Sequence, residues 1–409
     1  MYYIRLLHGP RFEPPSHDQS SKKVVSLAIM VAICNDLGEQ RLSPSEPVKM
    51  TVLVTSSAPG LPEIILKHQD NGSFCWGSNM WVRKTEPRFA VSEAKRLFAD
   101  GRSVSVTVDV VDQFLAIKHA RHLVPKQGEP PGKAIIFPVH SQCFWGAPGG
   151  TSEDHDVVRK LTLVDTVETP SAKALVFETA DDIGDSIPSH VWDSGIAMAA
   201  FYADLCLRPP TESSQSGVFP AVKNLLKKCS LSVLELGAGV CSQGMGLASV
   251  LSAQAQVPKA TIIMTDVDTA QKRAMANIER LKKSGALARR VVLEFEILDW
   301  EDGASGLFGH RAGSQAWDLI LVSDCTYNYD TIPVLVQTFS ALHKANLSHR
   351  PGLTSRILLS TKQRHDSETI FFDHIREAGW VTREQGVIPF PVAENAADED
   401  MEVYLFEKQ

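Results

Sequence analysis

The chain has 409 residues, of which 44% are hydrophobic and 22% charged, and its formal net charge at pH 7 is −7. This is the composition of a globular protein that is long enough for about two domains. Because a surface that binds duplex nucleic acid usually makes its domain basic, the charge argues against nucleic acid as the main partner. The seven cysteines form no Cys-x-x-Cys pair, so the sequence predicts neither a disulfide framework nor a metal site.

The first 170 residues predict a mostly β extension or small domain. Residues 48–55 and 103–111 are rich in β-branched side chains, as strands are. An apolar run at 24–34 is about half as long as a membrane span and indicates a core strand or helix. We therefore expect no membrane association and a location in the cytosol or nucleus. Substrate recognition is one role open to this extension.

The second domain is predicted over residues 171–409. Two short alternating runs, 160–167 and 173–178, predict a β-hairpin ahead of it, and helical spacing of apolar residues predicts a helix over 191–207. Strands are then predicted at 231–236, 260–265, 290–295, 317–322 and 356–360, and helices at 244–253, 270–284, 331–342 and 369–378. Apolar strands that alternate with helices predict a parallel sheet covered on both faces. A last run, 401–407, is expected to close the sheet in a hairpin with another late strand.

The sharpest local motif is Glu-Leu-Gly-Ala-Gly at 235–239, between a predicted strand and a helix. Gly237 and Gly239 allow the backbone to turn tightly and to approach a ligand, at the sheet edge where ligands bind. A purely structural turn is the alternative. Glu235 in front of the glycines can meet a cationic ligand group and would repel a pyrophosphate, and the dinucleotide spacing of glycines is not followed.

Two further motifs follow the next strands. The second strand ends at Asp266, whose carboxylate suits the two hydroxyls of a ribose, while Asp268 can cap the next helix. The third strand leads to Asp299 and Trp300, a carboxylate and a ring that can bind the amino group and the face of adenine.

Two more features complete the pattern. The fourth strand runs into Asp324 and Tyr327, three residues apart at the same edge, where a turn or a helix cap is the alternative explanation. Trp192 begins the helix that precedes the sheet and can wall a ligand, although a lone tryptophan usually belongs to a core.

In this order, Val-Trp-Asp-Ser, Glu-Leu-Gly-Ala-Gly, Thr-Asp, Asp-Trp and Asp-x-x-Tyr resemble the family 16 methyltransferases over about residues 185–409. The resemblance implies an α/β fold with a Rossmann-like, seven-stranded class I methyltransferase sheet. It implies S-adenosyl-L-methionine as cofactor and N-methylation of a lysine side chain in a protein. It also implies that the cofactor is bound by Trp192, Glu235, Gly237, Gly239, Asp266, Asp299 and Trp300, and that Asp324 and Tyr327 are the catalytic residues facing the target amine.

One position departs from the family, which commonly has glycine where this chain has Cys241. A β-carbon narrows the loop and disfavours positive φ, so cofactor binding is expected to require Cys241 in an ordinary backbone conformation.

The expected partner is a protein substrate, with a translation elongation factor or a chaperone as the family's suggestion, and the expected state is a monomer. Two interpretations of the acidic stretch 394–402 are open: it attracts a basic protein surface, or it is an ordinary solvated loop. Three other functions stay open from the residues: an NAD-linked oxidoreductase, a non-catalytic scaffold of the same fold, and methylation of a small molecule.

Overall fold

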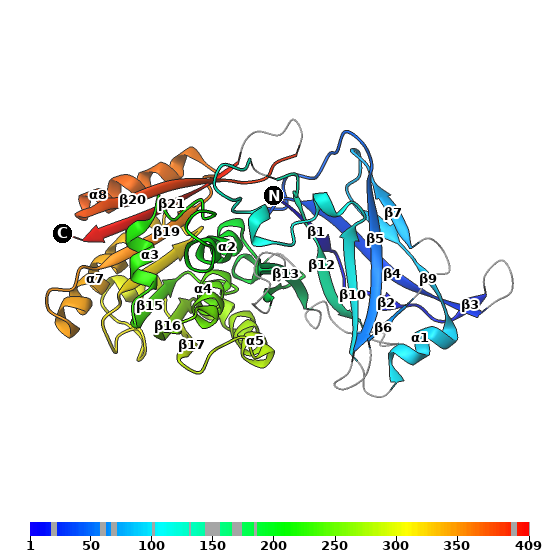
Figure 1. Cartoon of the computed structure of the whole chain (residues 1–409), viewed down its shortest axis with the longest axis horizontal. Coiled ribbons are helices and arrows are strands. Elements are labelled where there is room, and N and C mark those ends of the chain that lie inside the picture. Colours follow the sequence, from blue (N-terminus) through cyan, green and yellow to red (C-terminus); the bar gives the residue numbers. More distant parts are fainter. Residues whose placement is uncertain are drawn as a thin grey trace.

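The computed structural model describes residues 1–17, 23–57, 63–66, 72–99, 103–130, 132–143, 156–165, 174–183, 186–393 and 399–408. Residues 394–398 of the acidic stretch lie outside these ranges. The described chain forms an N-terminal part made mostly of strands and a C-terminal part in which helices cover a sheet (Figure 1). The sequence predicts both classes, and the structure confirms them.

The N-terminal part consists of two sheets that enclose one hydrophobic core. The first has the order β11 (Ile136–Phe137), β1 (Tyr2–Leu6), β4 (Lys23–Cys34), β2 (Arg11–Phe12), and β3 (Ser16–His17), β8 (Arg83–Thr85) and β9 (Arg88–Ala90) also pair with β4. The second has the order β14 (Leu175–Asp181), β13 (Val157–Val164), β12 (Val139–Cys143), β10 (Ser103–Val110), β5 (Val48–Ser57), β6 (Ile64–Ile65), with β7 (Ser73–Trp76) on β5. Alternate residues of β5 are buried, so each sheet turns one face inward, as in a β-sandwich.

The C-terminal sheet carries the switch in strand order that defines a ligand-binding edge. Its order is β17 (Val291–Ile297), β16 (Lys259–Asp266), β15 (Ser230–Leu236), β18 (Leu319–Ser323), β19 (Arg356–Thr361), β21 (Asp400–Lys408), β20 (Trp380–Pro389). The first five strands are parallel, and β21 runs antiparallel to both of its neighbours. Because the chain moves outward in opposite directions from β15 and β18, the carboxyl ends of these two strands border a crevice.

Helices cover both faces of this sheet. One face is covered by α2 (Asp193–Leu207), α3 (Pro220–Leu226), α4 (Ser242–Ala253) and α5 (Asp268–Ser284), and the other by α6 (Trp300–Ala304), α7 (Ile332–His349) and α8 (Ile370–Glu377). In β15, Val233 packs with the first group, whereas Leu234 and Leu236 pack with the second. Among the helices of the described residues, none is both long enough and apolar enough to cross a lipid bilayer.

The two parts share a continuous core rather than a loose linker. Tyr3, Phe137 and Phe177 of the N-terminal part pack in the same apolar cluster as α2 and α4. The Tyr3 hydroxyl donates a 2.7 Å hydrogen bond to Asp193 at the start of α2. The N-terminal sheet also continues past the predicted boundary at residue 170, because β14 pairs with β13 in the predicted hairpin. The N-terminus lies where the two parts meet (Figure 1).

Candidate functional site

A cleft opens at the carboxyl ends of β15, β16 and β18. Of the nine site residues predicted from the sequence, seven line it, namely Trp192, Gly237, Gly239, Asp266, Trp300, Asp324 and Tyr327. They come from five separate stretches of the chain, and the parallel sheet brings these stretches to one edge. Glu235 and Asp299 lie outside the lining.

The glycine loop has the conformation that its sequence predicts. Gly237 has φ 66° and Gly239 has φ 51°, both in the left-handed region where a β-carbon is disfavoured. A β-carbon at Gly237 would also collide with the sulfur of Cys325. The Gly239 amide donates a 2.7 Å hydrogen bond to Asp266, so the carboxylate of β16 holds the loop against the cleft.

The structure contradicts the expectation that Cys241 has an ordinary backbone conformation. Its φ is 68°, so it adopts the glycine-like conformation despite its β-carbon. The side chain is fully buried in the core around α4 and does not line the cleft. The cysteine therefore strains the backbone without narrowing the space available to a ligand.

Glu235 lies behind the loop instead of facing a ligand. Its side chain is fully buried, and Oε2 accepts a 3.0 Å hydrogen bond from the Gly244 amide in the first turn of α4. Oε1 has no hydrogen-bond partner among the described residues. Burial raises the pKa of Glu235 to about 8, although the hydrogen bond from Gly244 opposes the rise. The expected contact with a cationic ligand group is therefore replaced by a contact that braces α4.

The Glu235→Gln variant should have a stability that depends less on pH. The unfolded chain loses this proton near the ordinary pKa of 4.5, whereas the folded chain keeps it until about pH 8. Between these two pKa values the folded state binds more protons than the unfolded state. The free energy of unfolding of the wild type therefore falls by on the order of a few kcal/mol as the pH rises from about 4.5 to about 8. Glutamine does not titrate. Melting temperatures at pH 5 and pH 8 test this, and a wild-type difference retained by the variant would contradict it.

Asp299 and Trp300 separate into two roles. Asp299 is exposed, and its carboxylate accepts a 2.9 Å hydrogen bond from the Glu301 amide, which caps α6. Trp300 is half-buried and turns its ring into the cleft. Only the aromatic member of the pair is thus placed to meet a ligand in this structure.

Asp324 already accepts hydrogen bonds, through its carboxylate, from several groups of the protein itself. Its φ is 51°, and its carboxylate accepts hydrogen bonds from the Ser194 amide (2.9 Å) and hydroxyl (2.8 Å), the Lys362 amide (3.1 Å) and Arg364 Nη1 (2.9 Å). The side chain is 2% exposed. The carboxylate ties the start of α2 to the end of β19, whereas the sequence predicts that it faces a target amine.

A second cavity of about 240 Å³ adjoins the cleft and shares Trp192, Asp324 and Tyr327 with it. Tyr327 is 51% exposed, and burial of its other side raises its pKa, so the phenol stays neutral at pH 7. Leu37 of the N-terminal part lines the same cavity. The rings of Trp192 and Tyr327 therefore lie between the cleft and this second cavity.

Three charged residues that no sequence motif marked lie in or beside this cavity: Asp36 and Arg364 line it, and Lys362 lies next to it. Arg364 donates to Asp324 at 2.9 Å and to Asp36 of the N-terminal part at 2.5 Å. Lys362 donates to Asp193 at 2.9 Å and pairs with Glu399 at 2.8 Å. Although burial alone would lower the pKa of Arg364, Asp324 and Asp36 raise it, so the guanidinium stays charged. The position of Lys362 and Arg364 just past the carboxyl end of the strand Arg356–Thr361 is a signal that could have found them.

Gln243 is a further residue of the cleft that no sequence motif marked. It lies in the first turn of α4, is 1% exposed and lines the cleft. Its Nε2 donates to the Tyr202 hydroxyl at 3.0 Å, whereas Oε1 has no hydrogen-bond partner among the described residues. A buried acceptor of this kind is suited to a ligand donor.

Comparisons with known proteins give a family match. A family model described as lysine methyltransferase matches residues 172–378, just over half of the chain, and this range contains every predicted site residue. No curated protein matches the chain. The structure of the trans-methyltransferase CalH in complex with SAH is 16% identical over 52% of this chain and 59% of that chain, with a TM-score of 0.33. A SAM-dependent methyltransferase from Methanosarcina mazei is 12% identical over 46% of this chain and 97% of that chain, with a TM-score of 0.32.

Proposed function

Because this chain belongs to the lysine methyltransferase family and uses S-adenosyl-L-methionine, we propose that it methylates the side-chain amine of a lysine in a protein. The observation that carries the proposal is the pair of adjoining cavities that share Trp192, Asp324 and Tyr327. The residues that line the first cavity suit the cofactor, and the second cavity suits a long side chain that reaches the cofactor from outside. Family membership excludes the NAD-linked oxidoreductase.

The residues of the cleft fit the cofactor. The glycine loop offers bare backbone at Gly237, where a β-carbon would collide with Cys325. The free Oε1 of Gln243 suits the amino group of the methionine end. Asp266 lies at the end of β16, where a carboxylate suits the ribose hydroxyls, and Trp300 offers a ring for the purine. Trp192 would wall the methionine end.

The second cavity suits a lysine side chain. Its walls include the rings of Trp192 and Tyr327 and the apolar side chain of Leu37. Apolar and aromatic surfaces pack against the four-carbon stem of lysine, and an aromatic ring also attracts the cationic form. A volume of about 240 Å³ holds several water-sized groups, which is room for one such stem.

Held by the glycine loop, Asp266 and Trp300, the cofactor would supply an electrophilic methyl group on a positively charged sulfur, and the neutral lysine amine would be the group that accepts it. The amine must first give a proton to water, because a lysine near pKa 10.4 is almost wholly protonated at pH 7. Tyr327 remains a neutral phenol, so its part is to hold the stem in line with the methyl group. Asp324 is a positioning residue that acts through Ser194 and Arg364.

The test incubates the protein with radiolabelled S-adenosyl-L-methionine and an extract of cells that lack it, with a translation elongation factor as the first purified candidate. The wild type should label a discrete protein band. Tyr327→Ala should lower labelling about tenfold, which corresponds to the loss of one ring contact with the lysine side chain. Tyr329→Ala is the matched control, since Tyr329 is 57% exposed and lines neither cavity.

Three outcomes would contradict the proposal. Equal labelling by the two tyrosine variants would remove Tyr327 from the site. Label that appears only in small molecules would indicate a small-molecule methyltransferase. Binding of S-adenosylhomocysteine in calorimetry without any methylated product would indicate a scaffold.

A further inference from the structure

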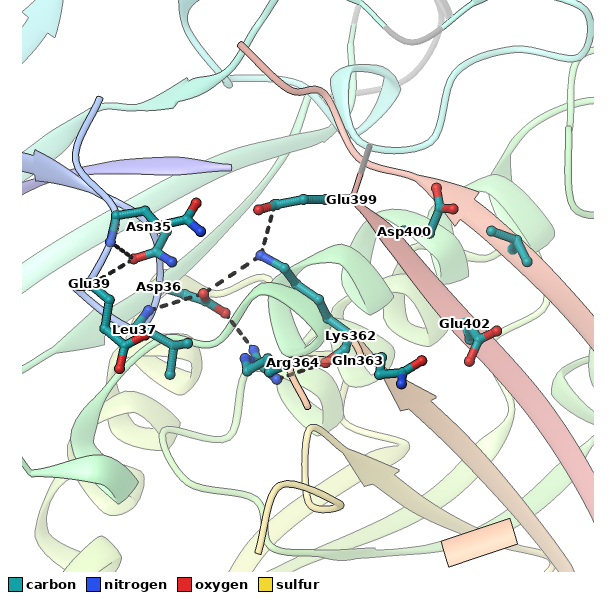
Figure 2. A pocket seen from close by; sticks show the side chains of 12 residues that line it. Asn35, Asp36, Leu37, Glu39, Lys362, Gln363, Arg364, Glu399, Asp400 and Glu402 are labelled. Carbon is teal, nitrogen blue, oxygen red and sulfur yellow. Dashed lines mark hydrogen bonds and ion pairs between the residues drawn. The ribbon is translucent and has the colours of Figure 1, made fainter. Parts of the chain in front are cut away.

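A groove of about 420 Å³ runs between the two parts of the chain, beside the second cavity. One wall is the turn of residues 35–40 (the 35–40 turn), and the other is the paired strands β20 and β21. Among the described residues that line it, the acidic side chains are Asp36, Glu39, Glu399, Asp400 and Glu402, and the basic ones are Lys362 and Arg364. Figure 2 shows the Lys362 amine between Asp36 and Glu399, and the Arg364 guanidinium on the other side of the Asp36 carboxylate.

The inner charges are already paired, whereas the rim carries excess negative charge. Asp36 pairs with Arg364, and Glu399 pairs with Lys362 and with the N-terminal amine. Glu39 and Asp400 are exposed and join no basic side chain in the described part of the chain. Exposed carboxylates without a basic neighbour leave a negative potential that attracts a positively charged surface.

The groove leads to the reacting centre. It shares Asp36, Leu37 and Arg364 with the second cavity. That cavity in turn shares Trp192 and Tyr327 with the cofactor cleft. A protein segment that lies in the groove can therefore send one side chain past Leu37 toward the methyl donor.

Arg364 joins the groove to the second cavity. Its side chain is 9% exposed and lines both the groove and the second cavity. Its Nε–H has no acceptor among the described residues, although both terminal nitrogens are used by Asp324 and Asp36. Arg364 therefore ties the 35–40 turn to Asp324, so the groove and the second cavity are held together by one side chain.

We propose that this groove binds the segment that flanks the target lysine, and that the segment is extended and basic. The proposal rests on the lysine methylation argued above and adds the substrate class. It assigns the N-terminal part a role in catalysis, because the 35–40 turn forms one wall of the path to the cofactor. The turn is held in place by Asn35, whose Oδ1 accepts hydrogen bonds from the Glu39 and Gln40 amides.

The test measures binding of two fluorescent peptides by anisotropy, in the presence of S-adenosylhomocysteine. Both have a central lysine, which is flanked by arginines in one peptide and by glutamates in the other. The wild type should prefer the arginine peptide, and Glu39→Lys/Asp400→Lys should weaken that binding about tenfold, as two reversed surface charges imply. The matched control is Glu46→Lys/Glu377→Lys, which changes the net charge equally at exposed positions outside the groove.

Each outcome decides the inference. Equal binding of the two peptides by the wild type, no binding of the arginine peptide, or equal weakening by both double variants would overturn it. Loss confined to the groove variant, with unchanged affinity for S-adenosylhomocysteine, would support it. Because binding is scored without methyl transfer, a protein that binds the arginine peptide through the groove but methylates nothing would contradict the proposed function alone.

Discussion

The Asp324→Ala variant is expected to lose methyl transfer by at least about 100-fold, because the residues that Asp324 positions would shift by a fraction of an ångström or more. The carboxylate joins Ser194 at the start of α2 to Arg364 beyond β19. Without it, Trp192 beside Ser194 and the wall formed by Arg364 lose their common anchor. The alanine would also have to adopt the φ of 51° that Asp324 has.

The same substitution should lower the free energy of unfolding by about 3–5 kcal/mol, since it leaves a buried guanidinium with one of its two carboxylate partners. Asp324→Asn is the control variant, because asparagine tolerates the left-handed conformation and keeps the shape while removing the charge. Methyl incorporation, thermal melting and calorimetry with S-adenosylhomocysteine separate the effects. An alanine variant with wild-type turnover would show that Asp324 positions nothing required for the reaction.

The strands and helices around the cleft follow from their sequences because the signals there are local. The runs 231–236 and 356–360 carry mostly apolar residues on consecutive positions, which is typical of strands buried on both faces, and both are strands. The strand β20 is harder to predict, because residues such as Arg383 and Glu384 interrupt its apolar pattern and most of its side chains are accessible. Its pairing with β21, rather than its own composition, makes it a strand.

The site residues show which information a linear motif lacks. The motif predicts Glu235 at the strand end, but strand alternation puts it on the same face as Val233, toward α4 and away from the cleft. Asp299 precedes a short helix, and its capping role follows from that position. The partner of Arg364, Asp36, lies 328 residues away in the chain, so only the folded arrangement of the two parts reveals it.

The Gly246→Leu variant is expected to be destabilised by about 2–3 kcal/mol or more, through overpacking between α2 and α4. A β-carbon at Gly246 would lie 2.5 Å from Cβ and 2.9 Å from Cα of Ala199, so any side chain must push the two helices apart. Because the first turn of α2 carries the Ser194 contacts with Asp324, the displacement should also impair methyl transfer.

Two variants separate this close contact from a general effect of replacing glycine. Gly217→Leu introduces the same side chain into open space and should melt within a few degrees of the wild type. Combining Gly246→Ala with Ala199→Gly moves the methyl group from one helix to the other, so the double variant should be more stable than the sum of its single changes predicts. Thermal melting of the wild type, the two leucine variants, the Gly246→Ala and Ala199→Gly variants and their combination tests both points, with methyl incorporation measured beside it. Additive losses in the double variant would mean that the approach of Gly246 to Ala199 does not set the position of α2, and that its start is fixed by the Asp324 contacts alone.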